Sequence, residues 1–141
     1  MLFRYFAVLL LVFAMAQNAN AKSFKDVKQL KWQNRVLILW SQDVDSTYAD
    51  VTAEHTAALN DRDLIVFVVD ETSLRTNFEG DLNDSFGASL RERYPQEKAS
   101  FFLLGKDGGL KRYGQEFSAR EIFAVIDSMP MRMRELDSEQ Y

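Results

Sequence analysis

The sequence predicts an α/β fold, a three-layer α/β/α sandwich around a small mixed sheet. Three observations lead to it: continuous apolar runs at 36–40, 64–69 and 101–104, helical periodicity between and after them, and a glycine-rich turn after the third run. Apolar runs of this length without alternation, rich in β-branched and aromatic residues, indicate strands covered on both faces. The composition, 47% hydrophobic and 27% charged, fits one small globular domain.

The first 21 residues have the three parts of a secretory signal peptide. Arg4 supplies the positive charge, 7–16 is an apolar run, and 19–21 (Ala-Asn-Ala) resembles a cleavage site. The apolar run is too short to span a membrane, which takes roughly 17–25 residues. We expect residues 1–21 to be removed, leaving 22–141 as one folded domain, periplasmic or secreted, with no membrane span after cleavage.

Composition excludes several kinds of chemistry. The chain has no Cys, so disulfides, thiol nucleophiles and Cys-ligated metals are ruled out, and a single His leaves no multi-His metal site. The net charge of −4 argues against nucleic acid or anionic lipid as a general partner, because phosphate is bound by a dominant basic surface.

The first half of the chain predicts a βαβ unit. Residues 24–30 have apolar positions three apart, as in a short helical turn. Between the first two strands, one helical face predicts a helix over 48–59, capped by a residue within 45–47 and closed by Asn60. Such a crossover between parallel strands is almost always right-handed.

The second half predicts helix, hairpin and helix. Asp84 or Ser85 begins a short helix that Pro95 ends. The turn at 105–109 leads into a strand over 110–113, since glycine accepts positive φ. The last helix begins at the capping box of Ser118 and is closed by Pro130, after which 131–141 is expected to fray.

This order suits a thioredoxin-like sandwich over residues 22–141, and two motifs add a resemblance. Residues 103–111 read LLGKDGGLK and 126–132 read IDSMPMR, with WQNRVLIL at 32–39 and DRDL at 61–64. Together they resemble a thioredoxin-like family, domain of unknown function 4174, found in exported bacterial proteins and in vertebrate extracellular proteins with sushi repeats. The resemblance implies an extracellular binding module and brings no established catalytic residues.

Redox thioredoxins carry Trp-Cys-x-x-Cys after the first strand, but here Trp40 is followed by Ser-Gln-Asp-Val at 41–44. A serine hydroxyl neither forms a disulfide nor reacts readily with peroxide. Thiol–disulfide exchange and Cys peroxidase chemistry are therefore excluded. The fold and the export signal point to a binding protein rather than an enzyme, with no catalytic residues, metal or cofactor.

One enzymatic alternative remains open. Residues 43–47 (DVDST) match the signature of haloacid-dehalogenase phosphatases, with Asp43 as nucleophile, Asp45 as acid/base and Lys106 neutralising phosphate beside Mg²⁺. Ser41 and Gln42 intervene between the strand and Asp43, whereas in that family the first Asp follows the strand directly. The alternative interpretation is a group of helix-capping residues.

Two stretches, 43–54 and 81–92, resemble calcium-binding loops. Both lack the glycine that such a loop has at its sixth position, with Tyr48 and Phe86 there instead, and we expect their polar residues to be helix caps. His55 lies on or beside the apolar face of the first helix, where we expect it to be partly buried without a catalytic role.

The candidate binding residues lie in the two motifs. Lys106 and Asp107 are in the glycine-rich turn, which could be a ligand loop or only a turn. Met131, Arg132 and Arg134 combine polarizable and cationic side chains just past a helix end, which suits an adaptable surface for a partner or a plain helix stop. We expect a protein or a glycan of the periplasm or envelope as partner.

Overall fold

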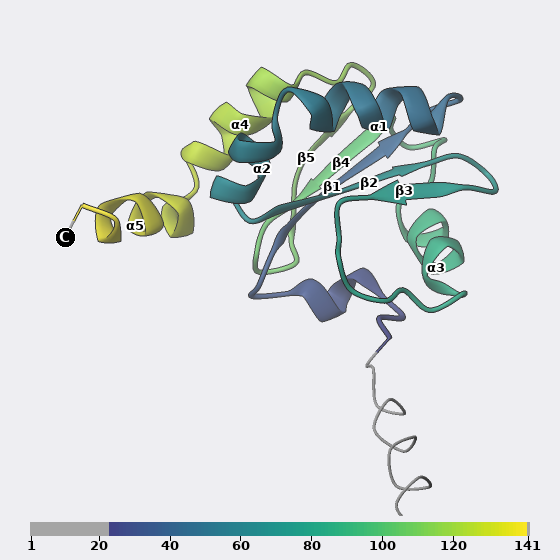
Figure 1. Cartoon of the computed structure of the whole chain (residues 1–141), viewed down its shortest axis with the longest axis horizontal. Coiled ribbons are helices and arrows are strands. Elements are labelled where there is room, and N and C mark those ends of the chain that lie inside the picture. The colour runs from purple at the N-terminus through teal and green to yellow at the C-terminus, as the bar shows by residue number, and fades with distance from the viewer. Residues whose placement is uncertain (1–22, 141) are drawn as a thin grey trace, which may run out of the picture.

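A computed structural model of the chain describes residues 23–140 (Figure 1). Its centre is a five-stranded mixed sheet with the order β3-β2-β1-β4-β5. β1 pairs with β2 in parallel and with β4 in antiparallel orientation, and β3 and β5 are antiparallel edge strands. The strands are β1 (Arg35–Trp40), β2 (Leu64–Val69), β3 (Leu74–Thr76), β4 (Phe101–Leu104) and β5 (Leu110–Gly114).

Helices cover both faces of this sheet. Figure 1 shows α1, α2 and α4 on one face and α3 on the other, with α5 projecting beyond α2 and α4 toward the C-terminus. The helices are the 3₁₀ helix η1 (Val27–Leu30), α1 (Val44–Ala53), α2 (Thr56–Asp61), α3 (Phe86–Arg93), α4 (Ala119–Asp127) and α5 (Pro130–Ser138). The predicted α/β class and mixed sheet are confirmed, and the layers are those of a thioredoxin-like α/β/α sandwich.

The sheet divides the core in two. On one face Leu37 and Leu39 of β1 pack in a cluster with Ile122 and Ile126 of α4. On the other face the alternate β1 residues pack in a cluster that includes Leu30 of η1 and residues of α3. Because strand side chains alternate between faces, both sets must be apolar, which explains the continuous apolar runs.

The helix predicted over 48–59 is wrong in its bounds, because it begins earlier and is interrupted. Asp43 is the N-cap of α1 and its carboxylate accepts from the backbone of Ser46, so none of the predicted capping residues serves as the cap. The helix is interrupted between Ala53 and Thr56, and His55 is the N-cap of the second piece, α2. Just before the interruption, the hydroxyl of Thr52 donates to the carbonyl of Tyr48 at 2.7 Å. Such back-bonding bends a helix. Asn60 lies within α2, which ends one residue later.

The prediction that Pro130 closes the last helix is wrong. α4 ends at Asp127, and Pro130 is the first residue of a new helix, α5. Proline suits this position because the first helical N–H has no partner within the helix. Met129 before it is extended, as the residue before proline prefers. The segment expected to fray is therefore helical through Ser138.

Strand β3 was not predicted, because its three residues are too short and polar to show a pattern. Two other local predictions are confirmed. Pro95 follows α3 directly after its C-cap, Tyr94. The hairpin forms at the glycine-rich turn, where Gly108 has φ of 79° and donates to the carbonyl of Gly105 at 3.0 Å.

The predicted signal peptide lies outside the described residues. Within 23–140, no helix is both long and apolar enough to cross a membrane.

Candidate functional site: a charge cluster and a cavity beside α5

Four segments distant in sequence meet at one edge of the sheet, the one where β1 and β2 begin. Arg35 begins β1, and Asp63 directly precedes β2, which runs parallel to β1. Because β4 is antiparallel to β1, its end and the following Lys106 arrive at this same edge. α5 lies beside this edge and contributes Glu135 to it.

Glu135 is the centre of this edge. Both terminal nitrogens of Arg35 donate to its carboxylate, at 3.2 and 3.3 Å, and the ammonium of Lys106 donates at 2.6 Å. Lys106 also donates to Asp63 at 2.8 Å. Arg35 is only 1% exposed, so its pairing with Glu135 lies under the surface. α5 is thus bound to β1 and to the turn after β4 through one carboxylate.

Arg132, one turn earlier on α5, anchors the helix a second time. Its guanidinium donates to the carboxylate of Asp61 at 2.5 Å, to the carbonyl of Asp61 at 2.9 Å and to Asp127 at 3.2 Å. Arg62 forms a two-bond pair with Asp127 at 3.0 and 2.8 Å. The charges balance across the whole cluster, whose members are Arg35, Arg62, Lys106 and Arg132 with Asp61, Asp63, Asp127 and Glu135.

These contacts favour the charged forms of Glu135 and Asp127. Burial alone would raise the pKa of Glu135, but hydrogen bonds from Lys106 and Arg35 outweigh it and keep that pKa below its ordinary value. Asp127 has a lowered pKa for the same reason, with Arg62 and Arg132 as its donors outweighing burial. One cost remains, because the Nε of Arg35 is buried and has no partner among the described residues.

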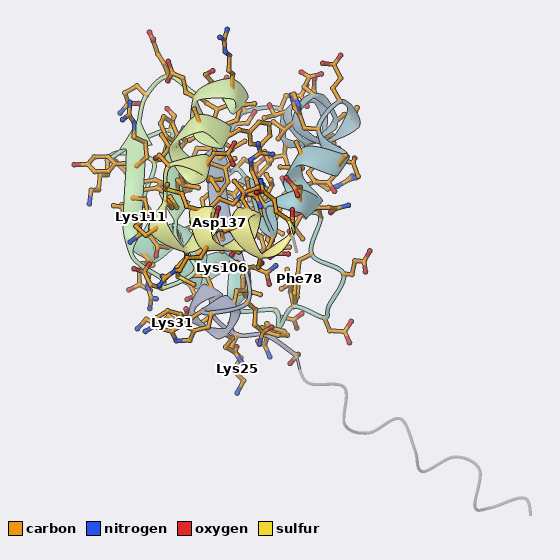
Figure 2. The ribbon with its side chains drawn as sticks, turned by 90° about the vertical axis from the view of Figure 1, so that its left-hand side faces the viewer. Lys25, Lys31, Phe78, Lys106, Lys111 and Asp137 are labelled. Carbon is orange, nitrogen blue, oxygen red and sulfur yellow. The ribbon has the colours of Figure 1, made fainter. Side chains whose placement is uncertain are left out.

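A cavity of about 260 Å³ opens beside this cluster. The side of the molecule that carries α5 is seen in Figure 2, where Lys106 and Lys111 are labelled. The lining is apolar on the α5 side and mostly cationic on the other. It consists of Met129, Pro130 and Met131 with Arg35, Gly105, Lys106, Asp107 and Lys111.

The family model described as a domain of unknown function (DUF4174) matches residues 26–135. The chain belongs to this family. No curated protein and no solved structure matches it. The match begins just before η1 and ends at Glu135, so the charge cluster and the cavity lie within the DUF4174 region.

The structure places the predicted binding residues of this DUF4174 chain in three different settings. Lys106, Asp107 and Met131 line the cavity. Arg132 is 2% exposed and is occupied by its ion pairs, so it supports α5 from within. Arg134 is exposed on α5.

Asp107 has two bonds within the turn. Its carboxylate accepts from Lys111 at 2.8 Å and from the backbone N–H of Gly109 at 2.9 Å. The bond from Lys111 is the main reason that the pKa of Asp107 is lowered, and the Gly109 N–H adds to it. Asp107 is therefore a fixed anion at the rim of the cavity.

The residues of the phosphatase alternative are not brought together. Asp43 caps α1 after the carboxyl end of β1, and Asp45 forms an exposed ion pair with Arg75 at 2.9 Å. Lys106 lies at the opposite edge of the sheet, with Asp63 and Glu135. Within residues 23–140, no group of three or more His, Cys, Asp or Glu side chains is arranged to hold a metal ion.

His55 is partly buried, as expected, and packs edge-on against Phe123 of α4, with ring centroids 5.4 Å apart. In the part of the chain that the structure describes, its position is explained by this packing and by its place at the start of α2.

Reasoning from the sequence missed most of the cluster: Arg35, Asp61, Arg62, Asp63, Asp127 and Glu135. One signal was available. Arg35 opens an otherwise apolar strand, and charged residues seldom begin a buried strand without a partner. The DRDL and IDSMPMR segments supplied opposite charges, but their meeting depends on the fold.

Proposed function

We propose that this DUF4174 chain is an exported, non-catalytic binding module that holds a protein or glycan partner over the cavity between the β4–β5 turn and the start of α5. The observation that carries the proposal is the cavity itself. It combines an apolar wall at Met129–Met131 with the cationic side chains of Lys106 and Lys111. Binding sites are usually concave and largely apolar, with a few polar groups that orient the ligand.

The electrostatics favour binding over catalysis. A general base at neutral pH works best with a pKa near 7. The carboxylates of Asp107, which lines the cavity, and Glu135, which lies behind it, have lowered pKa values, because each is fixed by cationic donors. The sequence contains no thiol that could act as a nucleophile. The cavity therefore supplies charge and shape, and neither carboxylate is poised to move a proton.

The place of action follows from the amino-terminal sequence. We include export in the proposal because Arg4, the apolar run at 7–16 and the small residues at 19–21 have the layout of a cleaved signal peptide. The test is amino-terminal sequencing of the protein recovered from the envelope and periplasmic fraction. We expect a chain that begins at Lys22. Recovery of the intact chain in the cytoplasm would contradict export.

Site-specific photo-crosslinking in cells tests the binding surface. A photoreactive amino acid replaces Lys111, which lines the cavity, and in a matched control it replaces Arg112, the next residue of β5. Successive strand residues point to opposite faces, so only the first position reports on the cavity.

We expect one discrete adduct at position 111, in the envelope fraction, and a much weaker one at 112, whose side chain points to the opposite face of the sheet. Periodate sensitivity of the adduct would mark a glycan, and protease sensitivity a protein. Equal adducts at both positions, or none at either, would contradict the proposed surface.

A further inference from the structure

We propose that the cavity takes the carboxyl terminus of a polypeptide whose last residue is apolar. This rests on the proposed function and makes it specific, because it selects the protein partner and names the part that binds. Three features carry it: unused lysine donors, the apolar wall of the cavity, and the free edge of β5 beside it.

The two lysines that line the cavity retain hydrogen-bonding capacity. An ammonium group has three N–H donors. Lys106 uses two of them, on Asp63 and Glu135, and Lys111 uses one, on Asp107. Among the described residues this leaves one donor on Lys106 and two on Lys111. A carboxylate accepts several bonds at once, and bonds between charged partners are the strong ones.

The cluster behind Lys106 explains how that donor is positioned. Asp63 and Glu135 hold the ammonium from two sides, and Arg35 holds Glu135 in place. Buried ion pairs contribute little net stability compared with apolar packing, and the Nε of Arg35 has no partner within residues 23–140. A cluster that fixes a lysine at the cavity is a reason for these charges that stability does not supply. Arg35 and Glu135 are thus positioning residues.

The cavity as a whole has the size of one apolar residue with its terminal carboxylate. Since liquid water takes about 30 Å³ per molecule, 260 Å³ has room for roughly eight or nine non-hydrogen atoms. A terminal leucine, with its carboxylate, is of that size. Met129 and Met131 form the wall, and methionine adapts to the shape of an apolar partner.

The outer side of strand β5 favours a polypeptide over a small free acid as the ligand. β5 is the last strand, paired on one side with β4, and nearly all of its residues are exposed. An extended peptide can pair with such an edge. Lys111 lies near the start of β5, so a peptide whose carboxylate meets Lys111 would run along β5 from Gly114 toward Leu110. That direction is antiparallel to β5, which is a favoured pairing.

The test is an NMR titration of the ¹⁵N-labelled mature protein, in the form recovered from cells. The ligand is an acetylated tetrapeptide of three threonines and a carboxy-terminal leucine. We expect shifts in the amides of Gly105, Gly109 and β5. The same peptide with a terminal amide should bind about tenfold more weakly, because it loses a charged hydrogen bond. Equal binding of acid and amide, or shifts confined to other regions, would overturn the proposal. Hexanoate that binds as tightly as the peptide would replace the polypeptide with a small free acid.

Two variants sharpen the result. Lys111→Met should lower the affinity for the acid peptide severalfold and leave the affinity for the amide peptide unchanged. The control Arg112→Met should alter neither affinity. Asp107→Asn should raise the affinity for the acid peptide, because it removes the acidic side chain that lines the cavity and releases Lys111. Weaker binding by Asp107→Asn, in a protein with unchanged thermal stability, would contradict the inference. An adduct at position 111 with a partner that has no apolar carboxyl terminus would contradict this inference but agree with the proposed function.

Discussion

Arg35 and Glu135 lie one hundred positions apart, and both terminal nitrogens of Arg35 bond to the carboxylate of Glu135. This pair joins the first residue of β1 to α5, the last helix of the described chain. Removal of one partner leaves the other charge desolvated, which costs more than the intact pair contributes. The following predictions start from this relationship and extend to the turn and to α1.

Glu135→Gln should lower the free energy of unfolding by about 2–3 kcal/mol, because Arg35 then remains buried without its counter-charge. Urea denaturation measures the loss. Glu139→Gln, at the exposed end of the same helix, is the matched control and should change it by less than about 0.5 kcal/mol. An equal loss in both variants would show that the pair has no special role.

The double variant Arg35→Met with Glu135→Gln should lose less stability than the sum of its two single variants. Each single change leaves one charge unpaired in a poorly solvated place, and the double change removes both. A coupling free energy of about 1–3 kcal/mol is expected from a double-mutant cycle measured by urea denaturation. Additivity of the two single changes would contradict a direct interaction.

Acid should weaken the fold through Glu135 and Asp127. Both carboxyls have folded pKa values below their ordinary values of 4.5 and 3.8, because basic neighbours outweigh the effect of burial. Their contribution to stability is therefore complete above the ordinary values and is lost as the pH falls toward the folded ones. Denaturation between pH 7 and pH 3 measures this, and the loss should be smaller in the variant with Glu135→Gln and Asp127→Asn.

Gly108→Ala should destabilise the hairpin by about 1–2 kcal/mol, since φ of 79° is unfavourable for a residue with a Cβ atom. Gly108→Asn is the control and should lose less, because asparagine tolerates this region better. Thermal unfolding compares the two. If alanine and asparagine cost the same, the left-handed backbone is not the reason for glycine here.

Asp43→Ala should cost about 1 kcal/mol, because the side chain caps α1. Asp43→Asn should leave stability nearly unchanged, since asparagine is an equally good N-cap. The same variants decide the phosphatase alternative. We expect no magnesium-dependent hydrolysis of p-nitrophenyl phosphate by the unaltered protein, and hydrolysis that disappears in Asp43→Asn would revive that mechanism.

How far the sequence predicted the structure can be seen in two prolines. The prediction that Pro95 ends a helix is confirmed, because α3 stops at the preceding C-cap. The same prediction for Pro130 is wrong, because Pro130 begins α5. Proline cannot donate to a preceding turn but fits the first turn of a new helix, so the residue alone permits both outcomes. The outcome at Pro130 depends on the tertiary structure, in which Arg132 and Glu135 of α5 bond to distant segments.

The candidate site divides in the same way. Lys106, Asp107 and Met131 could be selected from the sequence because a glycine-rich turn and a methionine–arginine segment are unusual locally. The charge of Arg35 at the start of an apolar strand indicates a partner, but the identity of that partner, and the place of Asp63 beside it, depend on strand direction. β1 and β2 start at the edge where the antiparallel β4 ends.

By itself, the amino-acid sequence determined the α/β class, the strands covered on both faces and the glycine turn, because these depend on the periodicity and backbone preferences of neighbouring residues. Only the tertiary structure decided that α5 exists, that opposite charges from four segments neutralise one another under it, and that a cavity forms between α5 and the turn. Those features need residues far apart in the chain to meet in a poorly solvated place, where unpaired charges would be costly.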